Sequence, residues 1–185
     1  MLFNRISSVF LLFSLFVFFS FSVLAQSILD QINDNTGFPN ITSDLLLEFP
    51  LDHGAHNEFR IEWWYVTANL KDDDKNTIGL QWTLFRVALE PKSNKDGWNK
   101  SQFWMGHAAI TDSQSHLFQE KIARGGIFQA GVSTEPFKAW IDDWKMEGNT
   151  WSDLHLSAGG ERFKYYINLE STGPIILHGI NGFSQ

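Results

Sequence analysis

The chain has 185 residues, contains no cysteine, is rich in aromatic residues and carries a formal net charge of −7 at pH 7. An acidic chain is a poor candidate for binding nucleic acid, because such binding is dominated by Lys and Arg contacts to phosphate. The lack of cysteine excludes disulfides, so the stability of the fold must come from an apolar core, for which the aromatic residues provide ample surface.

The first 25 residues have the pattern of a secretory signal peptide. Arg5 supplies a positive charge, an apolar run covers residues 9–24, and Ala25 places a small residue before Gln26. The run is shorter than the ~20 residues that span a bilayer, and no basic cluster follows it, which disfavours the alternative of an uncleaved anchor. We therefore expect cleavage near Ala25/Gln26 and a periplasmic or secreted location.

Residues 26–45 are polar and weakly patterned, and we interpret them as a flexible leader before a domain over residues 46–185. In that domain apolar and polar residues alternate, and turns follow one another at short intervals, which predicts β-strands. The expected strands cover residues 60–70, 77–89, 102–112, 116–123, 139–146, 151–157 and 162–170. Hairpin loops and the lack of a convincing amphipathic helix favour an all-β, antiparallel sandwich or barrel.

The strand expected over residues 60–70 has large side chains on both faces. Trp64 and Val66 fall on one face, and Ile61, Trp63 and Tyr65 fall on the other. This arrangement suits the wall of a barrel that is packed on its outside and lined by aromatic residues on its inside.

The densest group of chemically active residues precedes and begins this strand, between Phe49 and Tyr65. One hypothesis is a metal site with Asp52, His53 and His56 as ligands, joined by His107 from a later strand. The spacing matches no zinc pattern, so we favour a loop in which these side chains bond to nearby backbone. We predict neither a metal nor a cofactor.

A second hypothesis makes Glu62 a catalytic acid, with Asp52 as a second one. Glu62 shares a strand face with Trp64, and an apolar environment disfavours the charged carboxylate, so the group can hold a proton and donate it. The alternative is a structural ion pair with Arg86, which lies on an otherwise apolar face of the strand 77–89. The two interpretations are compatible, because an ion pair can also form part of a ligand site.

Two further features have an ordinary structural interpretation. Trp140 and Trp144 are four residues apart on the strand expected over residues 139–146 and project from the same face, with Asp142 between them, as in a core strand with an edge turn. His107 shares a face with Met105 and is interpreted first as a core histidine. No nucleophile elbow, P-loop or dinucleotide fingerprint is present.

The segment from Phe49 to Leu70 resembles the N-terminal domain of the carotenoid 1,2-hydratase (hydroxyneurosporene synthase) and AttH-like family. The family signature reads Phe-Pro-x-Asp-His-Gly-x-His-Pro-x-Phe-x-x-Glu-Trp-Trp-Tyr-x-Thr-Gly-x-Leu, and the chain departs from it only at Asn57 and Ala68. Later blocks, including residues 106–112 and 140–144, agree in order, so the resemblance covers roughly residues 45–185.

This resemblance implies a lipocalin-like (calycin) β-barrel, the first of two barrels in a full-length member and incomplete in this chain. The best-known chemistry of the family is the addition of water to a terminal isoprenoid double bond. The resemblance therefore implies that Glu62, Asp52 and His53 are candidate catalytic residues. The aromatic rings nearby would stabilise the cation that forms when the double bond is protonated.

From these observations we expect an exported domain that binds an apolar ligand, either an isoprenoid or a lipid. The candidate ligand-binding residues are Trp63, Trp64, Tyr65, Trp82, Arg86 and His107. One alternative is a hydratase- or hydrolase-type enzyme that protonates an isoprenoid double bond with a carboxylic acid. Another is a nonenzymatic accessory of an envelope lipid transport system.

Overall fold

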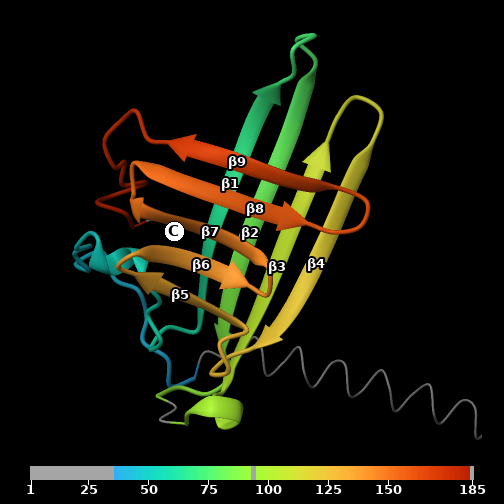
Figure 1. Cartoon of the computed structure of the whole chain (residues 1–185). Coiled ribbons are helices and arrows are strands. Elements are labelled where there is room, and N and C mark those ends of the chain that lie inside the picture. Colours follow the sequence, from blue (N-terminus) through green and yellow to red (C-terminus); the bar gives the residue numbers. More distant parts are fainter. Residues whose placement is uncertain (1–35, 93–94, 184–185) are drawn as a thin grey trace, which may run out of the picture. The chain divides into compact units, whose positions relative to one another are not determined.

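Nine β-strands form the regular structure of the residues described by the computed structural model, 36–92 and 95–183 (Figure 1). The predicted signal peptide and the first half of the predicted leader, residues 26–35, lie outside these residues. Two short 3-10 helices, Leu51–His53 and Gly97–Asn99, accompany the strands. The strands are β1 (Ile61–Lys71), β2 (Thr77–Ala88), β3 (Gln102–Thr111), β4 (His116–Arg124), β5 (Ala130–Thr134), β6 (Phe137–Ile141), β7 (Trp144–Thr150), β8 (Asp153–Gly159) and β9 (Lys164–Glu170).

The strands form two antiparallel sheets, in which each strand pairs with the next one along the chain. Sheet A contains β1–β4 and sheet B contains β5–β9. Figure 1 shows the strands of sheet B running across those of sheet A. The prediction of an all-β antiparallel fold is confirmed. Within the described residues no strand of one sheet is hydrogen-bonded to a strand of the other, so the sheets are not closed into a barrel. They face each other across a shared core.

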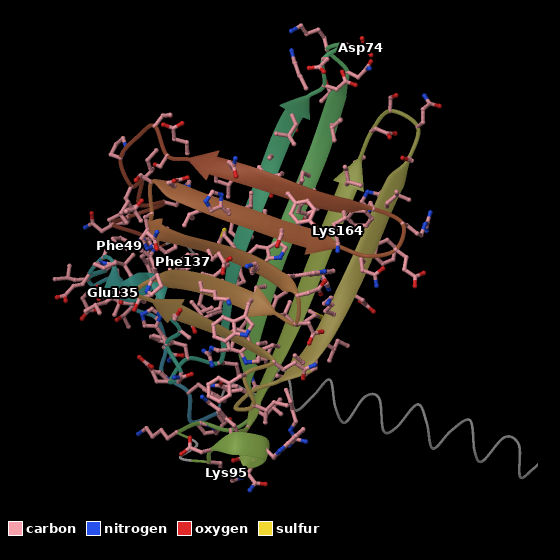
Figure 2. The ribbon with its side chains drawn as sticks, viewed as in Figure 1. Phe49, Asp74, Lys95, Glu135, Phe137 and Lys164 are labelled. Atoms are coloured by element: carbon pink, nitrogen blue, oxygen red, sulfur yellow. The ribbon has the colours of Figure 1, made fainter. Side chains whose placement is uncertain are left out.

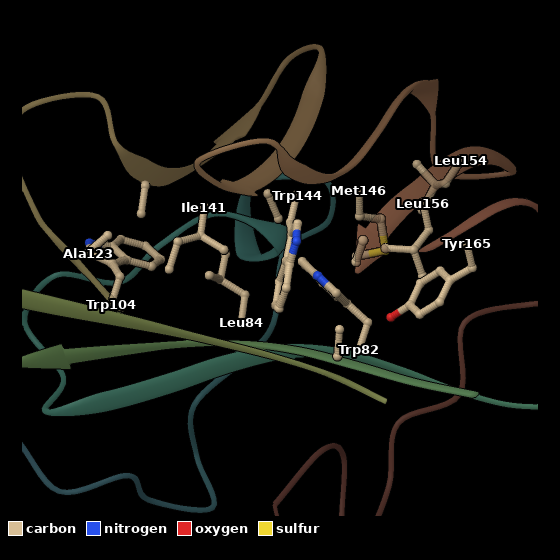
Figure 3. Packing of buried hydrophobic residues seen from close by; sticks show 14 of the residues in the cluster. Trp82, Leu84, Trp104, Ala123, Ile141, Trp144, Met146, Leu154, Leu156 and Tyr165 are labelled. Atoms are coloured by element: carbon tan, nitrogen blue, oxygen red, sulfur yellow. The ribbon is translucent and has the colours of Figure 1, made fainter. Parts of the chain in front are cut away.

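The core lies between the two sheets and consists mainly of large side chains. Trp82 and Leu84 of β2 face Ile141, Trp144 and other residues of sheet B (Figure 3). Packed sheets lie about 10 Å apart, and indole rings fill that space with few side chains. Strand alternation therefore sends one face of each strand into the core, as period-two patterning predicts.

Two hydrogen bonds and one glycine help to hold the core together. Tyr165 of β9 donates its hydroxyl to the carbonyl of Gln81 on β2 at 2.9 Å, and burial raises the pKa of this tyrosine above its ordinary range. Trp144 donates its indole N–H to the carbonyl of Gly159 at 2.6 Å. At Gly106 a Cβ atom would lie 2.8 Å from the side chain of Ile141, so only glycine allows the sheets to approach this closely.

The single strand predicted over residues 139–146 is wrong, because the chain turns there and forms β6 and β7. Asp142 occupies the turn with a φ of 52°, a left-handed conformation that Asp tolerates better than most residues. Trp144 is buried in the core, whereas Trp140 lies half-buried on the other side of sheet B. The buried positions are Phe137, Ala139 and Ile141 before this two-residue turn and Trp144 and Met146 after it, so the alternation shifts by one residue and the two tryptophans lie on opposite faces.

Candidate functional site

His56 forms the centre of a polar network in the loop before β1. Its Nε2 lies 2.9 Å from Asp52 Oδ1, and its Nδ1 lies 2.6 Å from Glu62 Oε1. Its backbone N–H donates to both oxygens of Glu62 as well. One carboxylate comes from the 3-10 helix and the other from β1, so this histidine fastens the loop to the strand.

Arg86 extends the network into the core. It lies opposite Glu62 in the β1–β2 register, and its Nε donates to Glu62 Oε2 at 2.8 Å. Its Nη2 donates to the carbonyls of His56 and Phe59 at 2.7 and 2.8 Å. The Arg86 side chain is fully buried, so it depends on these partners to balance its charge. The structural Glu62–Arg86 pair considered in the sequence analysis is therefore present.

The network sets the protonation of its members. Hydrogen bonds from His56 and from the backbone of Glu48 lower the pKa of Asp52. Burial opposes the charged form of His56, but hydrogen bonds with Asp52 and Glu62 outweigh it and raise the pKa of His56 above its ordinary value. Burial lowers the pKa of His53. At neutral pH, Asp52 is consequently charged and His53 is neutral.

The loop is also held by stacked rings. The His53 ring lies 3.4 Å from the Trp151 ring, which in turn lies 4.0 Å from Phe137 of β6. The backbone carbonyl of His53 accepts a hydrogen bond of 2.9 Å from the indole of Trp64. Figure 2 shows Phe49 and Phe137 close together at the left end of sheet B. The loop is thus fixed to sheet A by hydrogen bonds and to sheet B by aromatic contacts.

Of the four candidate metal ligands, only Asp52 and His56 contact each other. Both ring nitrogens of His56 are engaged by carboxylates, and His53 stacks on an indole. His107 points away from the core on β3, beside Phe85 at 5.4 Å, so its interpretation as a core histidine is wrong. In residues 36–92 and 95–183, no group of three or more His, Cys, Asp or Glu is placed to hold a metal ion.

The candidate ligand-binding residues are divided between the two faces of sheet A. Trp64, Trp82 and Arg86 lie on the inner face, toward sheet B. Trp63 and Tyr65, which are 56% and 59% exposed, lie on the outer face with His107. The two groups therefore cannot line one site.

Comparison with known proteins supports the resemblance seen in the signature. The AttH-like family matches residues 40–185, which is most of the chain. The chain belongs to the AttH-like family.

A solved structure with the same fold is that of a protein from Nitrosomonas europaea assigned as AttH, with 33% sequence identity and a TM-score of 0.67. The match covers 80% of this AttH-like chain and 45% of the Nitrosomonas chain, so the present chain spans less than half of that relative. No curated protein sequence is similar enough to this chain to count as a match.

The inner face of this AttH-like chain contains unpartnered N–H donors, and of their residues the sequence analysis named Arg86 and Trp82 but missed Trp104. Arg86 Nη1, Trp82 Nε1 and Trp104 Nε1 are buried without a hydrogen-bond acceptor, as is Trp151 Nε1 near the loop. Trp104 lies opposite Arg86 in the β2–β3 register, and its ring stacks on Trp64 at 6.0 Å. The aromatic content of the strands is visible in the sequence. Whether a buried N–H group finds a hydrogen-bond acceptor depends on how the two sheets pack, which the sequence does not show.

Across the described part of the chain, none of the helices has the length and apolar character needed to cross a membrane. The candidate signal peptide lies outside that part.

Proposed function

We propose that this chain binds an apolar molecule with one hydrogen-bond acceptor, such as a fatty acid or an isoprenoid alcohol, at the inner face of sheet A. The observation that carries this proposal is the group of unpartnered donors on Arg86, Trp104 and Trp82. Buried polar groups are normally paired, and leaving one unpaired costs about 1–3 kcal/mol. Arg86 and Trp104 lie opposite each other in the β2–β3 register, so a carboxylate, carbonyl or hydroxyl oxygen placed between them would supply the acceptor.

The edge strands support an apolar body for this ligand. β1 and β9 are edge strands of their sheets, and their core-facing side chains are only half-buried, apart from the buried Tyr165. Trp64 connects this accessible edge to the buried donors, because it stacks on Trp104. The half-buried apolar residues of the two edges are Trp64, Val66, Ala68, Leu70, Ile167 and Leu169. A chain-like apolar molecule could contact them while its polar end reaches Arg86.

Calorimetric titration with oleate, farnesol and octadecene tests the proposal. We expect oleate and farnesol to bind more tightly than octadecene, which has no acceptor. The variant Trp104→Phe keeps an aromatic ring and removes the N–H, so it should weaken oleate binding by about 2- to 10-fold, the value of one hydrogen bond. Trp98→Phe is the matched control, because Trp98 is 70% exposed outside the sheets.

Two outcomes contradict the proposal. One is the absence of saturable heat with all three molecules. The other is binding of octadecene as tight as that of oleate, which would remove the role of the donors.

Acid-catalysed hydration of an alkene by Glu62 or Asp52 receives less support from the contacts. Both oxygens of Glu62 accept hydrogen bonds from His56, and one also accepts from Arg86. Asp52 bonds to His56 and to the backbone N–H of Glu48. We therefore propose that these carboxylates position the loop. Water addition to an isoprenoid by the chain, lost in Glu62→Gln with the fold intact, would restore the acid assignment.

We also propose that the chain is exported, on the basis of the signal-peptide pattern of residues 1–25. Expression in a Gram-negative host should yield a periplasmic protein that begins at Gln26 on N-terminal sequencing. Recovery of the chain in the cytoplasm or membrane with residues 1–25 attached would contradict this.

A further inference from the structure

Arg86 has one terminal nitrogen without a hydrogen-bond acceptor. Its Nε donates to Glu62 Oε2 at 2.8 Å, and its Nη2 donates to the backbone carbonyls of His56 and Phe59 at 2.7 and 2.8 Å. Because Nη2 carries two N–H bonds, both of them are in use, whereas Nη1 is buried without an acceptor. A ligand can therefore reach this guanidinium only through Nη1.

This arrangement does not suit a carboxylate. A carboxylate binds arginine most strongly through two parallel N–H···O bonds from two neighbouring nitrogens. Any such pair on Arg86 includes Nε or Nη2, whose N–H groups already have acceptors. Glu62 also balances the charge of the fully buried Arg86 side chain, so a ligand carboxylate would add a second buried negative charge beside one guanidinium. A neutral acceptor avoids this cost.

A hydroxyl group fits less well than a carbonyl, because its own proton needs an acceptor. The nearest carboxylate, Glu62, is saturated. Its two oxygens are contacted by the backbone N–H of His56, which reaches both, by His56 Nδ1 and by Arg86 Nε, and a carboxylate has about four lone-pair sites. In the described part of the chain, every buried side-chain atom without a partner is a nitrogen donor, on Arg86, Trp82, Trp104 or Trp151. A buried hydroxyl would thus replace one unpaired donor with another.

We infer that the polar end of the ligand is a neutral carbonyl oxygen, as in a fatty acyl ester or a long-chain ketone. The inference rests on the proposed function, which requires only an acceptor, and narrows it to one chemical class. A carbonyl oxygen has two lone pairs and no proton, so it can accept one bond from Arg86 Nη1 and one from Trp104 Nε1. The two residues lie opposite each other on β2 and β3, where paired side chains have Cβ atoms about 4.5–5.5 Å apart.

Trp64 provides the contact for the apolar chain of such a ligand. Its ring stacks on Trp104 at 6.0 Å, and its side chain is only half-buried on the edge strand β1. Its indole N–H already donates to the carbonyl of His53 at 2.9 Å, so it presents an apolar ring and no unpaired donor. An acyl chain that packs on Trp64 would leave its carbonyl group for the donors behind that ring.

Titration calorimetry with methyl oleate, oleyl alcohol, oleate and octadecene, which share one chain length, tests the inference. All four are supplied from cyclodextrin at a pH where oleate is charged, and the heat of cyclodextrin alone is subtracted. We expect methyl oleate to bind most tightly. Oleyl alcohol should bind roughly fivefold or more weakly, because its buried proton is unpaired, and oleate roughly tenfold or more weakly, because its charge is unmatched.

The infrared band of the ester carbonyl gives a second readout, which does not depend on the solubility of the ligand. Two hydrogen bonds should lower the C=O stretching frequency of bound methyl oleate relative to methyl oleate in hexane. Trp104→Phe removes one donor, so the band should return part of the way and the affinity for the ester should fall by about 2- to 10-fold. Trp98→Phe is the matched control and should change neither, because Trp98 is 70% exposed outside the sheets. Circular dichroism verifies that both variants fold.

The outcomes separate this inference from the proposed function. Binding of oleyl alcohol or oleate as tight as that of methyl oleate would overturn the inference and leave the proposed function standing. A carbonyl band that is the same in the wild type and in Trp104→Phe would overturn it as well, because Trp104 would then not be a donor to the ligand. If none of the four molecules binds, or if octadecene binds as tightly as methyl oleate, the proposed function fails and the inference fails with it.

Discussion

Removal of the charge on Glu62 should destabilise the fold strongly, and Glu62→Gln is the sharpest test of the polar network. The substitution preserves the shape and volume of the side chain. In the folded chain three donor groups converge on this carboxylate: the backbone N–H of His56, its Nδ1, and the Nε of Arg86 at 2.8 Å. A glutamine presents one NH₂ group in place of an oxygen, so at least one of these donors faces another donor.

The magnitude follows from the burial of Arg86. Its side chain is fully buried, so the loss of the carboxylate leaves a guanidinium charge without its counter-charge. Breaking a buried ion pair from one side costs about 3–5 kcal/mol. With an m-value of about 2 kcal/mol/M, the midpoint of urea unfolding should fall by roughly 1.5–2.5 M. Tryptophan fluorescence reports the transition, because several indoles are buried in the core.

Glu90→Gln is the matched control for this experiment. Glu90 pairs with Lys95 at 2.8 Å, but both side chains are about half exposed, and an exposed pair contributes less than about 1 kcal/mol. Equal midpoint shifts in the two variants would refute the reasoning. The double variant Glu62→Leu with Arg86→Met should recover part of the loss, because an apolar pair needs no counter-charge.

The remaining predictions concern pH and packing. The pKa of His56 is raised in the fold, so its stabilising contribution is present below about pH 6.5 and is lost as the pH rises through its folded pKa. The pKa of His53 is lowered, so acidification below about pH 6.5 should reduce stability. Urea unfolding across this range checks both, and a decline above pH 6.5 that persists in His56→Gln would contradict the first. Gly106→Ala should destabilise by about 1–3 kcal/mol in thermal unfolding, because its Cβ would meet Ile141 at 2.8 Å. Gly173→Ala has no atom within 4 Å of its Cβ and should leave stability nearly unchanged, and equal effects in the two variants would exclude overpacking.

The sequence determined the class of the fold, because strand patterning is a local property. Side chains of a strand alternate between two faces, so the pattern from Ile61 to Leu70 predicted both β1 and the division of its residues between the faces. In the structure, exposed and half-buried side chains alternate along β1 as predicted. At Asp142 the same local reasoning failed, because one strand was predicted through Asp142 and Asp143 although the alternation of buried residues shifts by one position there. The pairing of Ile141 with Trp144 separates β6 from β7.

The signature also drew attention to polar residues in the loop before β1, but it did not predict how they are joined. Asp52, His56 and Glu62 are close in sequence, and their chemistry suggested either a metal site or an acid. The structure instead places His56 between the two carboxylates and Glu62 beside Arg86, which is 24 positions away along the chain. A carboxylate has several lone pairs, and the nearest donors in space determine which of them are used.

The composition by itself determined that a chain without cysteine must depend on its apolar core. The tertiary structure decided which aromatic residues belong to that core and which remain outside. Trp82 is buried between the sheets and Trp63 is 56% exposed, although both lie in strongly apolar strands. The packing of sheet B against one face of sheet A makes this difference, through contacts such as the bond between Tyr165 and Gln81, 84 positions apart. Such contacts depend on the path of the whole chain, so no short window of sequence contains them.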